Sequence, residues 1–76
     1  MRVVKGLRYI EDMAFYGFKK LKNVLLGDSL EIIGASAFEG SGLKSFTAPA
    51  SLKKIRDLAF CNCENLKRVD LSACTL

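Results

Sequence analysis

Three lysines and three cysteines are the residues of this 76-residue chain whose types and spacing suggest binding or reactive chemistry. Lys22, Lys44 and Lys67 recur at intervals of 22 and 23 residues. If each interval is one turn of a coiled chain, the lysines form a column with backbones roughly 5 Å apart. Such a column could attract the anionic groups of acidic proteins, glycans or phosphates. Alternatively, each lysine keeps its ammonium in water while its stem covers apolar surface, and it binds no ligand.

The cysteines Cys61, Cys63 and Cys74 fit neither a closed disulfide framework nor a zinc site. Their number is odd, and Cys61 and Cys63 are too close in sequence to bridge in most backbones. A structural zinc site needs about four ligands, but the chain has no histidine and no second pair of cysteines. We interpret the thiols as structural or incidental, with a redox or intermolecular role as the alternative.

Residues for catalysis are not indicated. Histidine, the commonest general base, is absent. Asp12 and Asp57 share one repeat position, but Ala35 occupies it in the middle repeat, so no row of paired carboxylates forms. The chain also has no Gly-x-x-x-x-Gly-Lys phosphate loop. We therefore predict a protein that is not an enzyme and has no catalytic, metal-binding or cofactor-binding residues.

A threefold repeat must position these side chains. Its first half reads Leu-x-x-Ile-x-x-x-Ala-Phe, in residues 7–15, 30–38 and 52–60. Its second half reads Leu-Lys-x-apolar-x-apolar, in residues 21–26, 43–48 and 66–71. The leading leucines lie 23, 22 and 24 residues apart when Leu76 is counted as the fourth, which is a period typical of solenoids. We expect one domain over 1–76, with repeats at approximately 7–29, 30–51 and 52–76 and a partial preceding strand at 1–6.

Each repeat should contribute one short strand and one turn. Apolar and polar residues alternate in the second half of the repeat, as in a half-buried strand, and successive strands can pair in parallel. Alignment on the repeat places Met1 and Val3 at the positions of Val24 and Leu26. An aspartate before Ala-Phe could cap a short helical turn. The predicted fold is an α/β solenoid of about three repeats, mostly short parallel strands with short helical or irregular turns.

Two further repeat positions predict details of the interior and the turns. The phenylalanines should stack along the axis as an aromatic column, and they are Phe15, Phe38 and Phe60. The position that follows them holds residue types that tolerate a left-handed backbone, namely Gly17, Gly40 and Asn62. Because each repeat buries its apolar face against the next, both ends of the stack should expose apolar residues. We therefore expect self-association through these ends.

The outward face of the strands is the natural binding surface of a solenoid. Its candidate partner-binding residues are Lys22, Asn23, Leu25, Lys44, Ser45, Thr47, Lys67, Arg68 and Asp70. Leu25 differs from the others because it is apolar at an outward position. It could be a contact anchor, although a single exposed leucine is common.

Composition narrows the classes of partner and compartment. The net charge of +4 and the pI of about 9.2 weakly favour acidic partners and keep nucleic acid as a second class. No apolar run reaches the roughly 18 residues of a membrane span, so we expect no membrane insertion, and no signal peptide is evident. The chain begins and ends within a repeat, so we expect it to be a piece of a longer protein.

Residues 55–71 read Ile-x-x-x-Ala-Phe-x-x-Cys-x-x-Leu-x-x-Val-x-Leu, a pattern that resembles the BspA-like, treponemal-type leucine-rich repeat family. The likeness covers about residues 7–71. It departs at the cysteine position, where the first two repeats have Phe18 and Ser41, and after the strands, where only Pro49 is proline. The resemblance implies a leucine-rich repeat solenoid in which Cys63 packs inward. It also implies a surface or secreted protein that adheres to host or matrix proteins.

The sequence thus predicts a protein–protein interaction or adhesion module that presents the strand face of a solenoid. A purely structural spacer of a larger surface protein is the first alternative. A basic nucleic-acid-binding module is the second.

Overall fold

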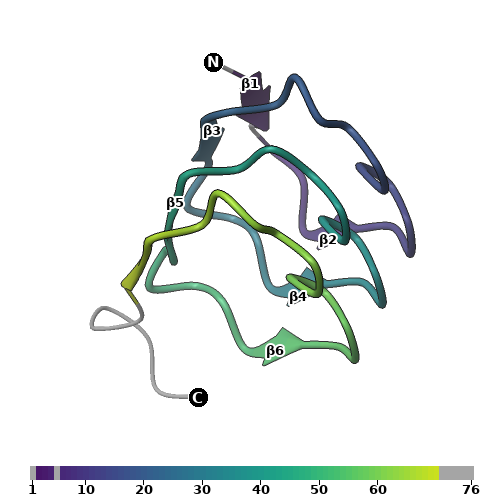
Figure 1. The fold of residues 1–76 in the computed structure, drawn as a ribbon. Coiled ribbons are helices and arrows are strands. Elements are labelled where there is room, and N and C mark those ends of the chain that lie inside the picture. Colours follow the sequence, from purple (N-terminus) through teal and green to yellow (C-terminus); the bar gives the residue numbers. More distant parts are fainter. Residues whose placement is uncertain (1, 5, 71–76) are drawn as a thin grey trace.

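The computed structural model describes the backbone of residues 2–4, and residues 6–70 with their side chains. These residues form short strands (Figure 1), which are β1 Arg2–Val4, β2 Tyr9–Ile10, β3 Val24–Leu26, β4 Ile32–Ile33, β5 Ser45–Thr47, β6 Lys54–Ile55 and β7 Arg68–Asp70. No helix occurs in this part of the chain. The expectation of helical turns is therefore wrong, and the turns are irregular. The expectation of one strand per repeat is also wrong, because each Leu-x-x-Ile segment forms a second short strand, β2, β4 or β6.

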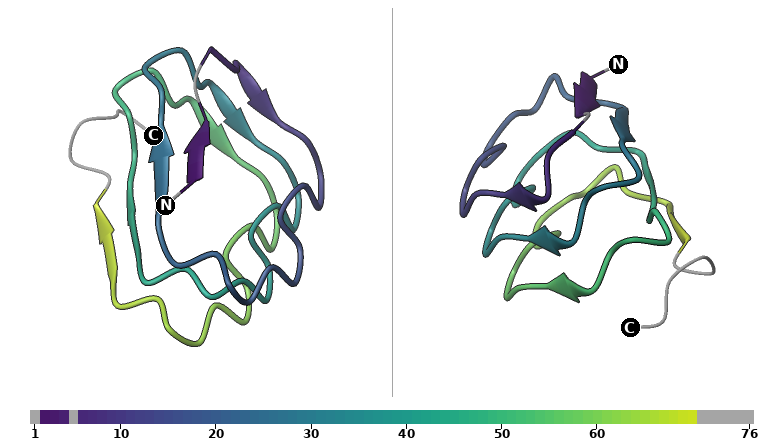
Figure 2. Two further views of the ribbon diagram at one scale, coloured as in Figure 1. Left: turned by 90° about the horizontal axis from the view of Figure 1, so that it is seen from above. Right: turned by 180° about the vertical axis from the view of Figure 1, so that it is seen from behind.

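All strand pairs are parallel and join residues one repeat apart. β1 pairs with β3, β2 and β6 flank β4, and β5 pairs with β7. The backbone N–H of Lys44 donates to the Lys22 carbonyl (3.0 Å), and that of Lys67 donates to the Lys44 carbonyl (2.9 Å). These bonds place the β1–β3 and β5–β7 sheets along one side of the molecule. The chain winds in successive stacked coils (Figures 1 and 2). Short parallel strands in this order fit a solenoid-like repeat fold.

The strand register agrees with the repeat alignment in one place and corrects it in another. Thr47 lies opposite Asp70, as aligned. In β1, however, Val3 lies opposite Leu25 rather than Leu26, so the predicted register is wrong by one residue. The reason is a shorter connection: two residues separate Val4 from the first repeat leucine, and three separate the equivalent pair in the next coil. Met1 lies outside the described residues.

The Ala-Phe segments are chains of tight turns. Residues at one repeat position have φ in the left-handed region, namely Met13 (+59°), Ser36 (+56°) and Leu58 (+62°). A right-handed helix needs φ near −60°, so these residues interrupt any helix. The other left-handed position was predicted and is confirmed at Gly17 (+71°), Gly40 (+71°) and Asn62 (+56°).

Asp12 does not cap a helix. Its Oδ1 accepts a hydrogen bond from the backbone N–H of Ala35, in the next coil, at 2.8 Å. The Tyr9 hydroxyl lies 3.4 Å from the same oxygen. The aspartate therefore links two coils, because no helix N-terminus is present to receive it.

The predicted aromatic column forms the centre of the core. The rings of Phe15 and Phe38 stack with centroids 5.3 Å apart, and those of Phe38 and Phe60 at 5.5 Å, with interplanar angles of 10° and 3°. Phe46, in β5, packs against this column, and its ring centroid lies 4.7 Å from that of Phe60. Buried leucine, isoleucine and alanine side chains surround the rings, and they include Ile10, Leu30, Ile33, Ala37, Leu43, Leu52 and Ala59.

Candidate interaction surface

The predicted strand face is a real surface of the molecule. In β3, Leu25 is 54% exposed between the half-buried Val24 and Leu26. In β5, Thr47 is exposed beside the buried Phe46. The register then sets Ser45 beside Arg68 and Thr47 beside Asp70. The outward positions of the second and third repeats are therefore adjacent in space, and the hydrogen bond from Lys44 N–H to the Lys22 carbonyl joins the first repeat to the second.

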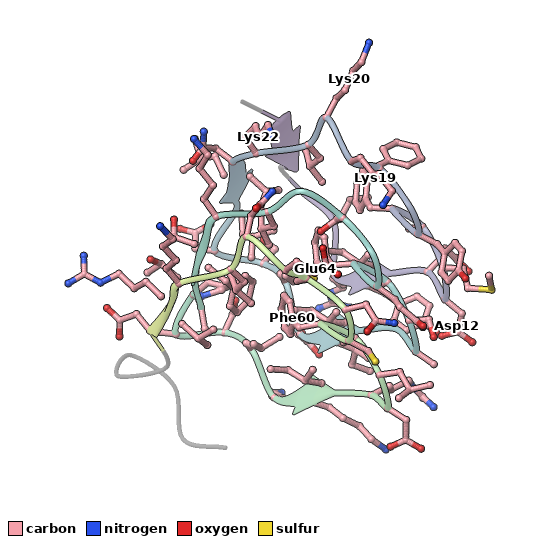
Figure 3. The ribbon with its side chains drawn as sticks, viewed as in Figure 1. Asp12, Lys19, Lys20, Lys22, Phe60 and Glu64 are labelled. Carbon is pink, nitrogen blue, oxygen red and sulfur yellow. The ribbon has the colours of Figure 1, made fainter. Side chains whose placement is uncertain are left out.

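The three lysines form the predicted column at the start of this face. Lys22, Lys44 and Lys67 are all exposed, and the backbone hydrogen bonds of 3.0 and 2.9 Å connect them in series. Figure 3 shows Lys22 beside β3, at the N-terminal end of the column. The ion pairs found among residues 6–70 involve none of these lysines. Three ammonium groups are thus available to an external anion.

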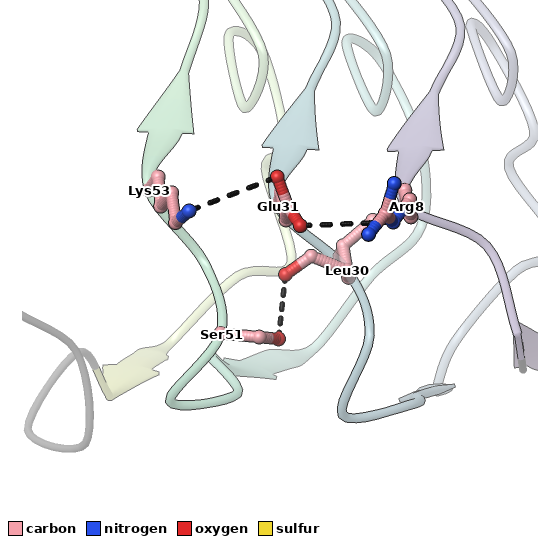
Figure 4. A network of polar contacts seen from close by, with 5 residues as sticks. All are labelled: Arg8, Leu30, Glu31, Ser51 and Lys53. Carbon is pink, nitrogen blue, oxygen red and sulfur yellow. Dashed lines mark hydrogen bonds and ion pairs between the residues drawn. The ribbon is translucent and has the colours of Figure 1, made fainter.

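A second charged row lies along the other sheet, where the cations are paired. Glu31 Oε2 lies 3.7 Å from Arg8 Nε, and Glu31 Oε1 lies 3.9 Å from Lys53 Nζ (Figure 4). The Ser51 hydroxyl donates to the Leu30 carbonyl at 2.6 Å nearby. Each repeat contributes one charge, and the single carboxylate lies between two cations, so the row keeps a net charge of +1. The lysine column, in contrast, has no carboxylate partner among the described residues.

Sequence reasoning missed a groove of about 540 Å³ across the ends of the Ala-Phe turns. Its polar lining residues come from three coils and include Lys19, Glu39, Ser41, Asn62, Glu64 and Asn65. The left-handed residues Gly17, Gly40 and Asn62 also line the groove, and their shared repeat position was the one feature of the sequence that pointed to it. Because the residue types differ from repeat to repeat, no motif marks it.

The described cysteines are free thiols in half-buried positions. Cys63 packs against the core, as the resemblance implied, and its S–H donates to the Phe38 carbonyl at 3.0 Å. Its sulfur lies 3.6 Å from the hydroxyl of Ser41, which holds the same position in the preceding coil. Cys74 lies outside the described residues. Among residues 2–4 and 6–70, no three His, Cys, Asp or Glu side chains are placed to hold a metal ion.

The chain has the features of a leucine-rich repeat protein. These are the parallel ladders, the stacked phenylalanines and a repeat period of 22 to 23 residues. A family model described as a BspA type leucine-rich repeat region (6 copies) matches residues 1–75, and the chain belongs to this family. No curated protein and no solved structure matches the chain. Leucine-rich repeats commonly mediate protein–protein interaction, and the family is typically non-enzymatic.

The described residues contain no helix that is long and apolar enough to cross a membrane.

Proposed function

We propose that this chain is a protein-interaction module of about three solenoid repeats whose strand face binds an acidic protein surface. The observation that carries the proposal is the lysine column. Lys22, Lys44 and Lys67 are exposed, are joined through consecutive backbone hydrogen bonds and have no ion-pair partner among the described residues.

The electrostatics of the column favour an anionic ligand. Adjacent coils are roughly 4.8 Å apart, so the three ammonium groups repel one another at close range. A row of carboxylates replaces that repulsion by attraction, and Arg68 extends the positive surface into β7. The exposed Leu25, in β3 and three residues after Lys22, supplies an apolar contact beside the charges.

Membership of the BspA-type family suggests a biological role. A surface protein that adheres to host or matrix proteins through this face fits both the repeats and the basic column, so we propose adhesion as the biological role. We also propose that the apolar ends of the stack associate with a further copy of the chain.

Binding to immobilised poly-L-glutamate, measured by biolayer interferometry, tests the strand-face proposal. The variant K22E/K44E/K67E removes the column, and K19E/K20E/K54E makes the same change in net charge at exposed lysines outside it. We expect the first variant to lose binding at least roughly tenfold more than the second, because only the column aligns its charges.

Equal losses would show that net charge alone causes binding and would refute the proposal. A wild-type chain that does not bind polyglutamate would favour the spacer. Tighter binding to a DNA duplex, with steep salt dependence, would favour the nucleic-acid alternative.

A further inference from the structure

Between residues 13–17 and 36–40, and between 36–40 and 57–61, the backbone hydrogen bonds that join successive coils run in one direction, whereas the Gly42 N–H, after the turn, donates back to Phe18. Alternate N–H groups of one coil donate to carbonyls of the next, at 2.7–3.0 Å. From the first coil to the second, the pairs are Met13 to Ala35, Phe15 to Ala37 and Gly17 to Glu39. From the second coil to the third, they are Ser36 to Asp57, Phe38 to Ala59 and Gly40 to Cys61.

This pattern leaves complementary groups at the two ends of the stack. At the C-terminal end, the N–H groups without a partner among the described residues are those of Leu58, Phe60 and Asn62. At the N-terminal end, the corresponding carbonyls without a described partner are those of Asp12, Ala14 and Tyr16. Backbone groups removed from water need partners. Three donors at one end therefore match three acceptors at the other, with the same two-residue spacing.

The central sheet, like every parallel ladder, has hydrogen bonds in both directions, and those at the ends of its strands run back toward the first coil. The N–H of Gly34 donates back to Ile10 at 2.8 Å, and that of Arg56 donates back to Ile33 at 2.9 Å. The C-terminal end thus continues this ladder with the Ile55 carbonyl, an acceptor, beside the three donors of the turn. Two identical ends placed together would set donors on donors and acceptors on acceptors. Only the C-terminal end of one molecule against the N-terminal end of another satisfies both ladders.

Side chains at the C-terminal end are apolar and exposed where their counterparts are covered. Val69 is 48% exposed, whereas Phe46, directly opposite it in the preceding coil, is 1% exposed. At the N-terminal end, Leu7 and Phe18 are about half exposed. A coil stacked on the C-terminal end would cover Val69 as β7 covers Phe46.

Strand β1 already occupies the position on β3 that a stacked second copy would need. β1 pairs with the edge of β3 that faces the N-terminal end. If the first coil of a second copy stacks on the last coil of this one, β7 comes to lie in the place of β1. Both strands have three residues, and Gly6 (φ +77°) sits between β1 and the first coil. An exchange of β1 for β7 therefore keeps the ladder of β3 complete.

We infer that the C-terminal end of the stack binds the N-terminal coil of a second copy of this chain, head to tail, with β7 of one molecule replacing β1 on β3 of the next. The contact is heterologous and does not close on itself, so it produces open chains of molecules. This inference deepens the self-association proposed above and does not require the strand face.

Sedimentation velocity of the full chain at concentrations up to about 100 μM tests the assembly, because association depends on protomer concentration. We expect the average mass to increase beyond that of a dimer. V69D, which would bury a carboxylate at the joint, should weaken association at least roughly tenfold. The matched control A50D adds the same charge at an exposed position of the middle coil, away from both ends of the stack, and should assemble like the wild type.

A mass that stays at the monomer, or that stops at the dimer, would overturn the head-to-tail geometry. An A50D variant as defective as V69D would overturn it too, provided circular dichroism shows both to be folded. Salt separates the two proposals. Assembly places Lys67 beside Lys22 of the next copy, so added salt should strengthen it, whereas salt should weaken polyglutamate binding.

A disulfide lock tests the strand exchange itself. Val3 and Leu25 lie opposite each other in adjacent strands, within the Cα separation that a disulfide spans. We expect V3C/L25C, with Cys61, Cys63 and Cys74 changed to serine, to be monomeric when oxidised and to assemble when reduced. Assembly of the oxidised form as strong as that of the reduced form would refute the exchange, and a monomer in both states would refute the assembly.

Discussion

Replacement of Phe38 by alanine should remove most of the stability of the fold. Phe38 is fully buried, with 0% of its surface exposed. Its ring lies between those of Phe15 and Phe60, and its centroid is 6.5 Å from that of Phe46. Because repeats are held together by contacts with their neighbours, this ring belongs to both interfaces of the stack.

The magnitude follows from burial and stacking. A buried phenylalanine replaced by alanine costs about 3–5 kcal/mol, which includes the cavity left behind. Stacked aromatic pairs add about 0.5–1.5 kcal/mol each, so Phe38, with two such pairs, belongs near the upper limit of that range. A domain of this length has a free energy of unfolding of roughly 4–11 kcal/mol. F38A should therefore lose roughly half of it or more, and its Tm should fall by roughly 20–40 °C.

Urea unfolding followed by far-UV circular dichroism measures this loss. F18A is the matched control, because Phe18 is 47% exposed and touches only the rim of the column, edge-on to Phe15 at 5.6 Å. We expect F18A to cost about 1 kcal/mol or less. F60A should fall between the two, since Phe60 is half-buried and has one stacked neighbour in the column. If F38A costs no more than F18A, the aromatic column does not hold the coils together.

Two other substitutions test close contacts between coils. A Cβ on the buried Gly42 would lie 2.0 Å from the carbonyl oxygen of Lys19, so G42A should destabilise the fold by at least about 1–3 kcal/mol in the same urea assay, and a cost below that would show that the turn relaxes freely. D12A loses the hydrogen bond to Ala35 and should cost about 1 kcal/mol, whereas D57A, at the equivalent position with no described side-chain partner, should be nearly neutral; equal effects would contradict the role given to Asp12.

One strand of each repeat could be predicted from the sequence, because the periodicity of β3, β5 and β7 is set by burial, whereas β2, β4 and β6 were not predicted. Apolar residues alternate in the second half of each repeat, and a slip of one residue would expose Phe46, so the register of β5 on β7 follows directly. β1 has no such constraint. Two adjacent valines, Val3 and Val4, fit either register, and a connection shorter by one residue decides between them.

The turn conformation could not be predicted for a different reason. Met13, Ser36 and Leu58 are left-handed although none is glycine or asparagine, so their residue types give no signal. Hydrogen bonds to the next coil hold the backbones of Met13 (to Ala35, 2.9 Å) and Ser36 (to Asp57, 3.0 Å), and Leu58 follows the Asp57 whose carbonyl accepts from Ser36. Those contacts are between residues far apart in sequence. A local pattern of Asp followed by Ala-Phe therefore suggested a helix cap where the structure has an inter-coil link.

The lysine column could be predicted in its alignment but not in its function. Its alignment follows from the repeat, and the hydrogen bonds of Lys44 to Lys22 and of Lys67 to Lys44 agree with it. The groove across the turns gave no comparable signal, because its lining changes from coil to coil. Whether the column binds an anion stays a prediction, since exposure is equally consistent with solvated lysines.

Differences between the repeats have two physical origins, and only one of them can encode a partner. The Asp12 carboxylate reaches the N–H of Ala35, and a Cβ on Gly34 would lie 2.6 Å from that carboxylate. The glycine of the middle repeat is therefore fixed by the aspartate of the first, and its departure from the pattern is structural. Leu25 and Thr47 also differ, but both are exposed, so packing does not dictate either. Variation can therefore mark binding residues in this fold only where the side chain is free of the neighbouring coil, as on the proposed strand face.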